Sequence, residues 1–340
     1  MTEQRPRRGR PRRATIYATV DEGIEDLARV GGLPHPAEAD SIWRGIWHEE
    51  THNSTAIEGN TLILRQVATL LEQGLAVGNK ELREYLEVQA YADAAQWVYE
   101  QATTAGDWIS GDLLNLTELR EIHRRVVERV WKDFPPDDFH AQEGPGSFRQ
   151  HDIAAFPGGM TPPPVIAVPG LVHDWIVNVN RGPGLDEHLV QYLARIHARF
   201  ESIHPFRDGN GRTGRLVVNL LLVRQGLPPA IIYNRERSRY IEALVRADRH
   251  GDAGALAEMI ARSIRDSIDR FVLPALAGPQ RMVPLTSLAG PELSIIALRN
   301  AAERGRLRAQ RRGTRWYSTH QWVGEYAASR HQRRSARGDN

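Results

Sequence analysis

The sequence of 340 residues predicts an all-α fold, and its hydrophobic periodicity is the main evidence. Apolar residues recur at three- and four-residue spacing from about residue 19 to 110, and again from 113 to 131, as on the buried face of an amphipathic helix. The same spacing returns between about 172 and 272. Residues 133–171 differ, because they are rich in Pro and Gly, and we expect a loop with a small β-hairpin there.

These patterns divide the chain into four regions. Residues 1–18 begin with a Pro- and Arg-rich stretch that is too polar to fold alone, so a disordered basic arm is expected. An N-terminal helical region follows at 19–110, and a second helical domain is expected at 111–275. Residues 283–332 have helix, hairpin and helix signals of their own, which predict a small separate unit.

Composition excludes several classes of protein. The chain has no cysteine, so disulfide scaffolds, thiolate catalysis and zinc sites built on sulfur are ruled out. No stretch approaches the roughly 18 to 20 apolar residues that span a bilayer, and the N-terminus has no apolar leader segment. We therefore expect a cytoplasmic protein without a membrane partner.

The two ends of the chain are basic, although the net charge is only +2. Six arginines lie in residues 1–13 and eleven in residues 299–340, which leaves about −11 for the middle. Basic ends on an acidic body suggest that the ends bind a polyanion, and nucleic acid is the first candidate. The alternative is that the many arginines reflect a general preference for Arg over Lys, because lysine occurs only at positions 80 and 132.

The densest polar chemistry is HPFRDGNGRTGR, residues 204–215. It follows a helical stretch, 189–203, that must end at His204 because Pro205 disfavours helical geometry in the residue before it. Gly209, Asn210 and Gly211 can take positive φ, so their N–H groups could form an anion-binding nest.

A second helix is expected at 212–226, with its N-terminus directed at this nest. Arg212 and Arg215 lie three residues apart on one face, and together these features describe a polyphosphate site. Asp208 offers a hard oxygen ligand for Mg²⁺. The alternative for a lone Gly-rich turn is a plain tight connection between helices.

The stretch resembles the Fic motif, HxFx(D/E)GNGRxxR, at every specified position. The resemblance extends from about residue 40 to 250 and implies an all-α Fic helical bundle that transfers AMP from ATP to a hydroxyl of a Ser, Thr or Tyr side chain on a target protein. Intact GNGR favours AMP transfer over phosphorylation, although other donors and AMP removal occur in the family.

The same resemblance implies roles for the motif residues. His204 would be the general base and Asp208 the Mg²⁺ ligand, and Arg215 would contact the γ-phosphate. The nucleotide-binding set would consist of Gly209, Asn210, Gly211, Arg212, Gly214 and Arg215, with Asn210 near the α-phosphate.

Two further segments resemble parts of Fic proteins. Residues 235–248 resemble the segment that lines the nucleobase pocket, where Tyr240 and Leu244 would sandwich adenine; ordinary core packing is the alternative. Residues 144–164 resemble the flap, a hairpin that holds the target segment by strand addition; an irregular surface loop is the alternative.

Residues 53–60, NSTAIEGN, contain a carboxylate in an unfavourable place. Glu58 meets the negative end of its helix, where Gly59 is expected to form the C-cap, so it requires a cation from elsewhere. Ser54 to Gly59 resembles the Fic inhibitory motif (S/T)xxxE(G/N). The resemblance implies a bidentate pair between Glu58 and Arg215 that would restrain the enzyme.

The ends of the chain carry signals of a different kind. Residues 283–332 resemble winged helix-turn-helix units, with Arg308, Arg311, Arg312 and Arg315 near the wing and Ser318 as the expected cap of the last helix. RGRPR at 8–12 resembles an AT-hook, with a basic solvated tail as the alternative. Two functions therefore stay open: an autoinhibited AMP-transferring enzyme that also contacts DNA, and a DNA-binding regulator whose Fic core senses nucleotide. A second copy of the chain is a further candidate partner.

Overall fold

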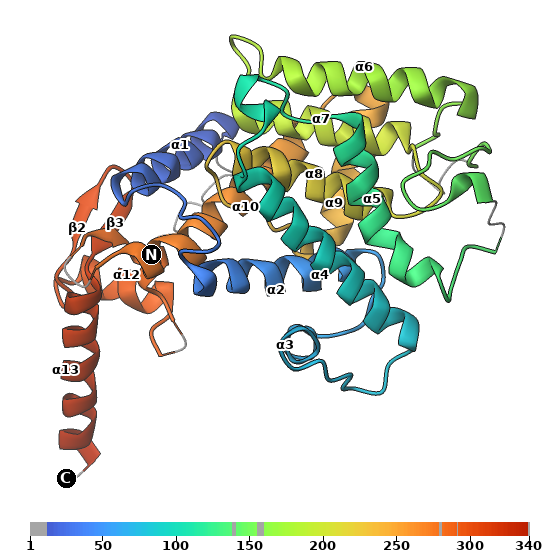
Figure 1. The fold of residues 1–340 in the computed structure, drawn as a ribbon. Helices are drawn as coiled ribbons and strands as arrows, with labels where there is room; N and C mark the ends of the chain where they lie inside the picture. The colour runs from blue at the N-terminus through green and yellow to red at the C-terminus, as the bar shows by residue number, and fades with distance from the viewer. Residues whose placement is uncertain (1–11, 138–140, 155–159, 279–280, 291, 339–340) are drawn as a thin grey trace, which may run out of the picture.

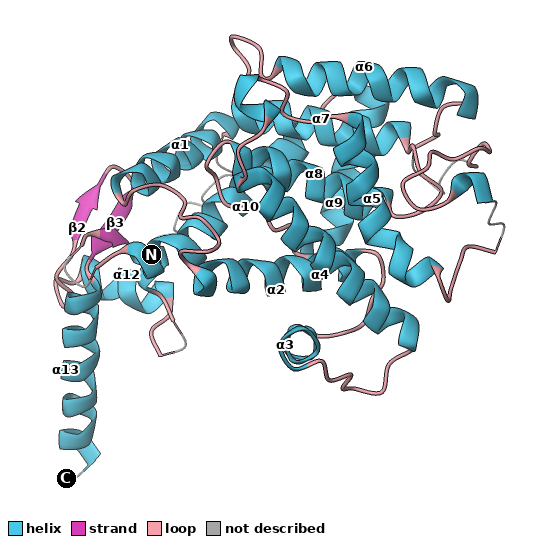
Figure 2. Ribbon diagram, viewed as in Figure 1, coloured by secondary structure: helices cyan, strands magenta, loops and turns pink. Residues whose placement is uncertain are grey.

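The computed structural model describes residues 12–137, 141–154, 160–278, 281–290 and 292–338. Helices make up most of this part of the chain, and a small three-stranded sheet lies near its C-terminal end (Figure 1, Figure 2). The predicted all-α fold is therefore confirmed.

Helices follow one another through most of the chain, and the strands come late. The first half contains α1 (Arg13–Arg29), α2 (Asp40–Ile57), α3 (Leu64–Gln73), α4 (Leu82–Thr103), α5 (Leu116–Trp131) and α6 (Val168–Arg181). The central part contains α7 (Leu189–Ile203), α8 (Asn210–Arg224), α9 (Arg237–His250) and α10 (Gly254–Ser267). A π-helix (Ile268–Val272), α11 (Leu273–Leu276), β1 (Val283–Pro284), α12 (Ile295–Glu303), β2 (Gln310–Arg312), β3 (Arg315–Ser318) and α13 (His320–Gly338) complete the chain.

Helices α7 and α8 lie at the centre of a single large core. Helix α8 packs against α4, α5 and α7, and α10 packs against α1 and α7 (Figure 1). Buried side chains from α1, α2 and α4 through α11 belong to one continuous hydrophobic cluster, whereas α3 and the first turns of α4 share a small separate cluster around Val67, Leu70 and Tyr85. The boundary predicted at residue 110 therefore does not separate two cores; α4 and α5, on either side of it, pack closely together.

Local sequence signals explain where the site helices begin and end. Asn115 caps α5: its side-chain oxygen accepts from the Glu118 N–H at 2.9 Å, and the Glu118 carboxylate accepts from the Asn115 N–H at 3.1 Å. Helix α7 spans the predicted residues and ends at His204, before Pro205. The tight turn after it returns the chain at once into α8.

The predicted disordered arm of residues 1–18 is wrong at its C-terminal end. Helix α1 begins at Arg13, whose guanidinium pairs with Glu258 at 3.1 Å and Asp252 at 3.5 Å. Ile16 and Tyr17 are buried in the main core, and this burial together with the Arg13 ion pairs stabilises a helix that composition alone did not predict. Residues 1–11, with most of the AT-hook-like stretch, lie outside the described residues.

The predicted flap hairpin is not seen in the described part of 144–164. Residues 144–154 and 160–164 contain no strand, and residues 155–159 lie outside the described residues. Side chains organise the described part instead: the Glu143 carboxylate accepts from the Gln150 N–H at 2.5 Å, and Asp152 accepts from the Val165 N–H at 2.6 Å. These contacts replace strand pairing at the two ends of the loop.

The C-terminal unit has its own small core. Strands β1 and β2 both pair with β3 in antiparallel fashion, in the order β1-β3-β2, and α12 packs beneath them. The predicted turn at Gly313 and the last helix are present, but the expected Ser318 cap is wrong. Thr319 accepts from the Trp322 N–H at 3.1 Å, whereas the Ser318 hydroxyl donates to the Arg308 carbonyl at 2.6 Å. Helix α13 extends away from the body (Figure 1).

A buried charge network joins the C-terminal unit to the helical body. Arg265 of α10 makes a two-point contact with Asp269 of the π-helix, with Nη2–Oδ1 and Nε–Oδ2 distances of 2.5 and 2.9 Å. Asp269 also accepts from the Thr286 hydroxyl at 2.7 Å, and Asp26 of α1 accepts from the Tyr317 hydroxyl at 3.2 Å. The two cores are therefore connected by charged hydrogen bonds.

None of the helices in the described part of the chain has the length and apolar character needed to span a bilayer.

Loss of the Asp269 carboxylate should destabilise the protein strongly. Asp269→Ala leaves the buried Arg265 guanidinium without its two-point partner, which should lower the free energy of unfolding by about 3 kcal/mol. Urea unfolding followed by circular dichroism measures the change. Glu25→Ala is the matched control, because it removes an exposed i,i+4 pair with Arg29 and should cost less than about 1 kcal/mol. Equal effects of the two variants would contradict this view of the network.

Candidate active site

The residues of the 204–215 motif lie on the turn between α7 and α8 and on the first turns of α8. His204 is the C-cap of α7 and has the left-handed conformation φ 49°. Gly209 is the N-cap of α8 with φ 77°. Asn210 and Gly211 are already helical, so the predicted nest of three positive-φ residues is wrong. The anion-binding end is instead the N-terminus of α8 itself, which starts two residues earlier than predicted.

Burial keeps the His204 imidazole neutral. Loss of hydration disfavours the charged ring and lowers the pKa of His204 to about 4, with the Arg149 charge acting in the same direction. Asp208 and Glu58 oppose this shift, as does the hydrogen-bonding contact between Nδ1 and the Glu201 carbonyl at 3.3 Å. A neutral imidazole is the form that can accept a proton.

An aromatic stack beneath the turn fixes its shape. Phe206 is fully buried and stacks on His123 of α5, with ring centroids 3.7 Å apart and planes inclined by 2°. His123 Nδ1 accepts from the Gly146 N–H at 2.9 Å, which leaves Nε2–H to donate to the Asp208 carbonyl at 3.0 Å. Burial lowers the pKa of His123 to about 3, so it stays in this neutral form.

His123 was not predicted as a site residue. The available signal was its place beside the buried Ile122 in an otherwise apolar helical stripe, but the sequence does not show which backbone atom such a ring meets.

The Asn210 side chain braces the turn. Its carbonyl oxygen accepts from the Phe206 N–H and its amide donates to the Phe206 carbonyl, both at 2.9 Å. These two contacts use both ends of the amide inside the protein. In this arrangement Asn210 is a structural support for the turn, and the predicted placement of its side chain near an α-phosphate stays a prediction.

Glu58 and Arg215 meet across the site, as the sequence predicted. Arg215 Nη2 donates to Glu58 Oε1 at 2.7 Å and to the Ser54 carbonyl at 3.0 Å, and Nε donates to the Ser54 hydroxyl at 2.8 Å. The predicted bidentate form is wrong, because Ser54 takes the donor that would make the second contact to the carboxylate. Glu58 is the C-cap of α2, and Gly59, with φ 108°, comes directly after it, where the chain leaves the helix.

Glu58 and Arg215 each favour the charged form of the other. Burial would raise the pKa of Glu58, but Arg215 and Arg212 outweigh it and hold that pKa below its usual value. Burial would likewise lower the pKa of Arg215, but Glu58, Tyr240 and Tyr91 raise it. Both groups are therefore charged at neutral pH, and the pair is charge-assisted.

Close packing defines the space in front of α8. A Cβ at Gly211 would lie 2.5 Å from Glu58 Oε1 and 3.1 Å from Arg215 Nη1, so the Glu58 carboxylate lies directly against the helix backbone. Gly214 faces α7 instead, where a Cβ would lie 2.6 Å from Glu201 Oε1. The absence of a side chain at Gly214 therefore permits the close packing of α8 on α7, and its predicted place in the nucleotide-binding set stays a prediction.

Glu201 is a buried carboxyl that the sequence analysis did not select. Burial raises its pKa to about 8; Arg215 opposes this shift and Glu58 adds to it. The side chain is therefore mostly protonated at neutral pH, next to the charged Glu58–Arg215 pair.

Asp208 and Arg212 are neighbours at the mouth of the site. Arg212 Nη2 lies 3.4 Å from Asp208 Oδ1, a long contact, and Arg212 Nε is buried without a hydrogen-bond partner among the residues that the structure describes. Burial would raise the pKa of Asp208, but Arg212 and the Gly209 N–H lower it, so the carboxylate is charged. Its side chain exposes 42% of its surface and can reach a ligand.

Tyr240 and Leu244 lie inside the core in this structure. They expose 1% and 3% of their surface, and the Tyr240 hydroxyl contacts His197 Nε2 at 2.8 Å. The alternative of core packing therefore describes their present surroundings. The predicted adenine sandwich stays a prediction, and it would need this part of the core to open.

Residues 113–222 match the model of the Fic/DOC family. The chain contains a Fic domain. It is 28% identical over 309 residues to protein adenylyltransferase Fic of Drosophila yakuba, covering 87% of this chain and 58% of that protein. It is 33% identical over 259 residues to the protein of the same name from Culex quinquefasciatus, covering 75% and 47%. The chain thus spans about half the length of these curated relatives.

Solved Fic structures share the fold. Fic-1 from C. elegans superposes with a TM-score of 0.61 at 25% identity, over 76% of this chain and 71% of the other. A Fic family protein from Desulfovibrio desulfuricans superposes with a TM-score of 0.56 at 24% identity, over 93% and 98%.

The His204 ring should stay neutral far below the ordinary histidine range. Because burial penalises the charged form, its Cε1–H resonance should not move as pH falls from about 8 to 5, and should titrate near pH 4. Proton–carbon NMR of the histidine rings measures this, with His204→Ala to assign the resonance. A midpoint near 6.5 would show that the ring is solvated.

Proposed function

We propose that this chain is a protein adenylyltransferase, which transfers AMP from ATP to a hydroxyl side chain of a target protein and is restrained by Glu58. The observation that carries the proposal is the meeting of three groups at one helix end: the neutral His204, the N-terminus of α8 and the Glu58–Arg215 pair. The names of the relatives agree with this activity.

The residues at the site fit a triphosphate. The N-terminus of α8 supplies free N–H groups and a partial positive charge, and Arg212 and Arg215 add two full charges on the same turns. Arg212 Nε has no hydrogen-bond partner among the described residues and so leaves a donor for a phosphate oxygen. Gly211 has no side chain, and the space in front of it would be open to phosphate once the Glu58 carboxylate has left. In this proposal Arg215 binds the γ-phosphate once Glu58 has left.

The donor set also fits a magnesium ion. Among the described residues, no group of three or more His, Asp or Glu side chains could enclose a metal, so the ion would be held by Asp208 together with phosphate oxygens and water. When bound, Mg²⁺ would neutralise phosphate charge.

The protein groups account for the chemistry of transfer. His204 accepts the proton of the target hydroxyl as its oxygen bonds to the α-phosphorus. The bond between that phosphorus and the bridging oxygen of the β-phosphate breaks, and pyrophosphate leaves. The α8 N-terminus and Arg212 stabilise the charge on the phosphoryl oxygens, so positioning and electrostatics supply most of the catalysis.

Glu58 restrains this reaction by occupying Arg215. Its carboxylate lies against Gly211 and binds the guanidinium that the γ-phosphate needs. ATP would have to bind without that contact, in a strained or incomplete arrangement.

Removing the Glu58 carboxylate should activate the enzyme. Glu58→Gly frees Arg215 and should raise AMP transfer about 10- to 100-fold, since a charge-assisted hydrogen bond contributes about 1.5–3 kcal/mol. Incorporation of label from ATP labelled at the α-phosphate, into the protein itself and into lysate proteins, measures it. His204→Ala in the Glu58→Gly background should abolish the signal.

Glu38→Gly is the matched control, because Glu38 is exposed in a turn outside the site. It should behave as the unaltered protein does. Equal, low incorporation in Glu58→Gly and the unaltered protein would refute the inhibitory role. Mass spectrometry of the labelled products would identify the transferred group and the modified residue.

A second candidate function is DNA binding by the C-terminal unit. The strand order β1-β3-β2, with α12 before the β2–β3 hairpin, is the arrangement expected for a winged-helix unit. The predicted row of wing arginines is only partly available, however. Arg315 pairs with Glu22 at 3.2 Å, and Arg308 and Arg312 lie over the rings of Trp322 and Tyr317. Arg311 is exposed on β2.

Arg311 should therefore make the clearest phosphate contact in the unit. If the unit binds duplex DNA, Arg311→Ala should weaken binding of all sequences alike and reduce the slope of log K against log salt by about 1. Fluorescence anisotropy with a labelled duplex measures both. Arg199→Ala, on the exposed face of α7, is the control. Absence of binding at low salt would exclude this function.

A further inference from the structure

Arg149 is a buried arginine in the loop between α5 and α6, outside the motif. The residue exposes 1% of its surface. Within the described part of the chain, its one carboxylate partner is Asp152, whose Oδ1 lies 3.9 Å from Nη1 and is largely exposed. So distant a partner offsets little of the cost of burying a guanidinium, and other contacts must do so.

Those contacts are made to three backbone carbonyls, one in the site turn and one at each end of segment 151–163. Nε donates to the His204 carbonyl at 3.0 Å, Nη1 to the His151 carbonyl at 2.9 Å, and Nη2 to the Pro163 carbonyl at 2.5 Å. The backbone N–H of Arg149 donates to the Pro205 carbonyl at 2.9 Å. One residue therefore joins the site turn to both ends of segment 151–163.

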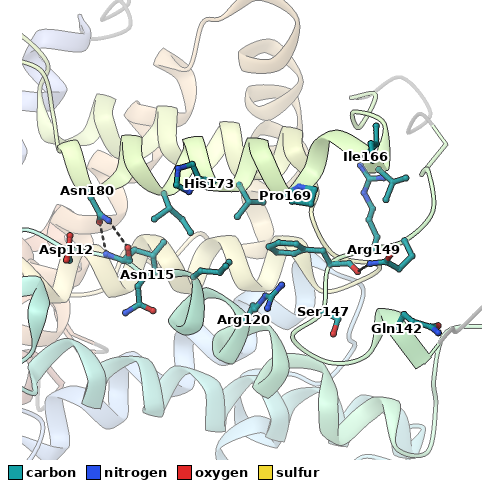
Figure 3. Close-up of a pocket in the computed structure, with 17 residues that line it drawn as sticks. Asp112, Asn115, Arg120, Gln142, Ser147, Arg149, Ile166, Pro169, His173 and Asn180 are labelled. Carbon is teal, nitrogen blue, oxygen red and sulfur yellow. Dashed lines mark hydrogen bonds between the residues drawn. The ribbon is translucent and has the colours of Figure 1, made fainter.

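Figure 3 shows where this side chain lies. Arg149 extends along one end of a pocket of about 740 Å³, beside Ile166 and away from the opposite end, where Asn180 lies. The two segment ends that it joins are 12 residues apart in sequence. Asp152 also links them by accepting from the Val165 N–H, whereas Glu143 accepts from the Gln150 N–H beside the first end. Arg149 alone among these three side chains also reaches His204.

The contact to His204 matters because that residue is strained. A non-glycine residue at φ 49° costs of the order of 1 kcal/mol and persists only where its surroundings fix it. Helix α7 fixes the residue on one side through the His204 N–H, which donates to the Phe200 carbonyl at 3.0 Å. Arg149 fixes it on the other side through the carbonyl. The direction of the imidazole depends on both.

We propose that Arg149 is a positioning residue, which holds His204 and both ends of segment 151–163 in one fixed arrangement. The segment lies within residues 144–164, which resemble the flap that receives the target, so one guanidinium would align the proton acceptor with the target-binding loop. Its charge also faces His204 together with those of Asp208 and Glu58, and it favours the neutral ring. The catalytic part of this inference depends on the proposed function; the structural part does not.

The first test needs no enzymatic activity. Arg149→Met removes the guanidinium donors at similar length, and amide hydrogen exchange at Gln150 and Val165 should become at least about tenfold faster, while exchange in α10 stays unchanged. Arg224→Met is the matched control. Arg224 is similarly enclosed and donates to the Leu113 carbonyl and to Glu118, at the opposite end of α8. It should leave Gln150 and Val165 protected.

The second test measures transfer in the Glu58→Gly background. Arg149→Met should lower kcat about 10- to 100-fold with the KM for ATP within about threefold, because a misplaced base slows the reaction without changing phosphate contacts. Arg149→Lys keeps the charge but has a single donor nitrogen in place of the three of the guanidinium, and should recover part of kcat.

The outcomes separate the two proposals. Unchanged exchange at Gln150 and Val165 in Arg149→Met would overturn the positioning role, as would an equal loss of kcat in Arg224→Met. If the Glu58→Gly protein with Arg149 intact transfers no label, the proposed function fails, and the exchange result still decides whether Arg149 fixes the loop.

Discussion

The buried guanidinium of Arg215 is the interaction on which the arrangement of the site depends. It comes from the second turn of α8, and it binds Ser54 and Glu58 from the end of α2. A buried positive charge must be paired, so the pairing fixes α2 against α8 at this point. Glu50, two turns earlier on α2, adds a second buried link by accepting from the Asn219 amide of α8 at 2.7 Å and from Tyr91 of α4 at 2.8 Å.

The turn after α7 obeys a different constraint, because backbone contacts hold it in place. The His204 carbonyl is bound by Arg149, the Asp208 carbonyl by His123, and both backbone groups of Phe206 by the Asn210 side chain. Under the proposed function, these contacts would direct the reactive side chains while leaving them available. The motif would then divide its residues between catalysis and structural support, and resemblance alone does not distinguish the two.

The sequence predicted the helices of the site well, because they follow from strong local signals such as Pro205 after a helix. A carboxylate at a helix C-terminus indicated that Glu58 needs a cation, and the resemblance to the Fic inhibitory motif implied that Arg215 is that cation. The sequence did not predict Arg149 or His123, whose roles depend on which backbone carbonyls the fold places beside them. It also placed three positive-φ residues at 209–211, where one is enough once α8 begins at Asn210. The surroundings of Tyr240 could not be predicted from the sequence either, because the three- and four-residue helical spacing is the same for a core residue and for a residue that lines a pocket.

Two contacts from Ser54 to Arg215 do not involve Glu58. The Glu58 side chain exposes 39% of its surface and stands at the C-cap of α2, whereas Ser54 is buried within the helix. The carboxylate can therefore leave by rotation about its own side-chain bonds, with α2 still docked and Arg215 still held in place. In the proposed mechanism, release of Arg215 by Glu58 is therefore a change of side-chain rotamer at the end of α2, and the two Ser54 contacts would keep α2 against α8 while it happens.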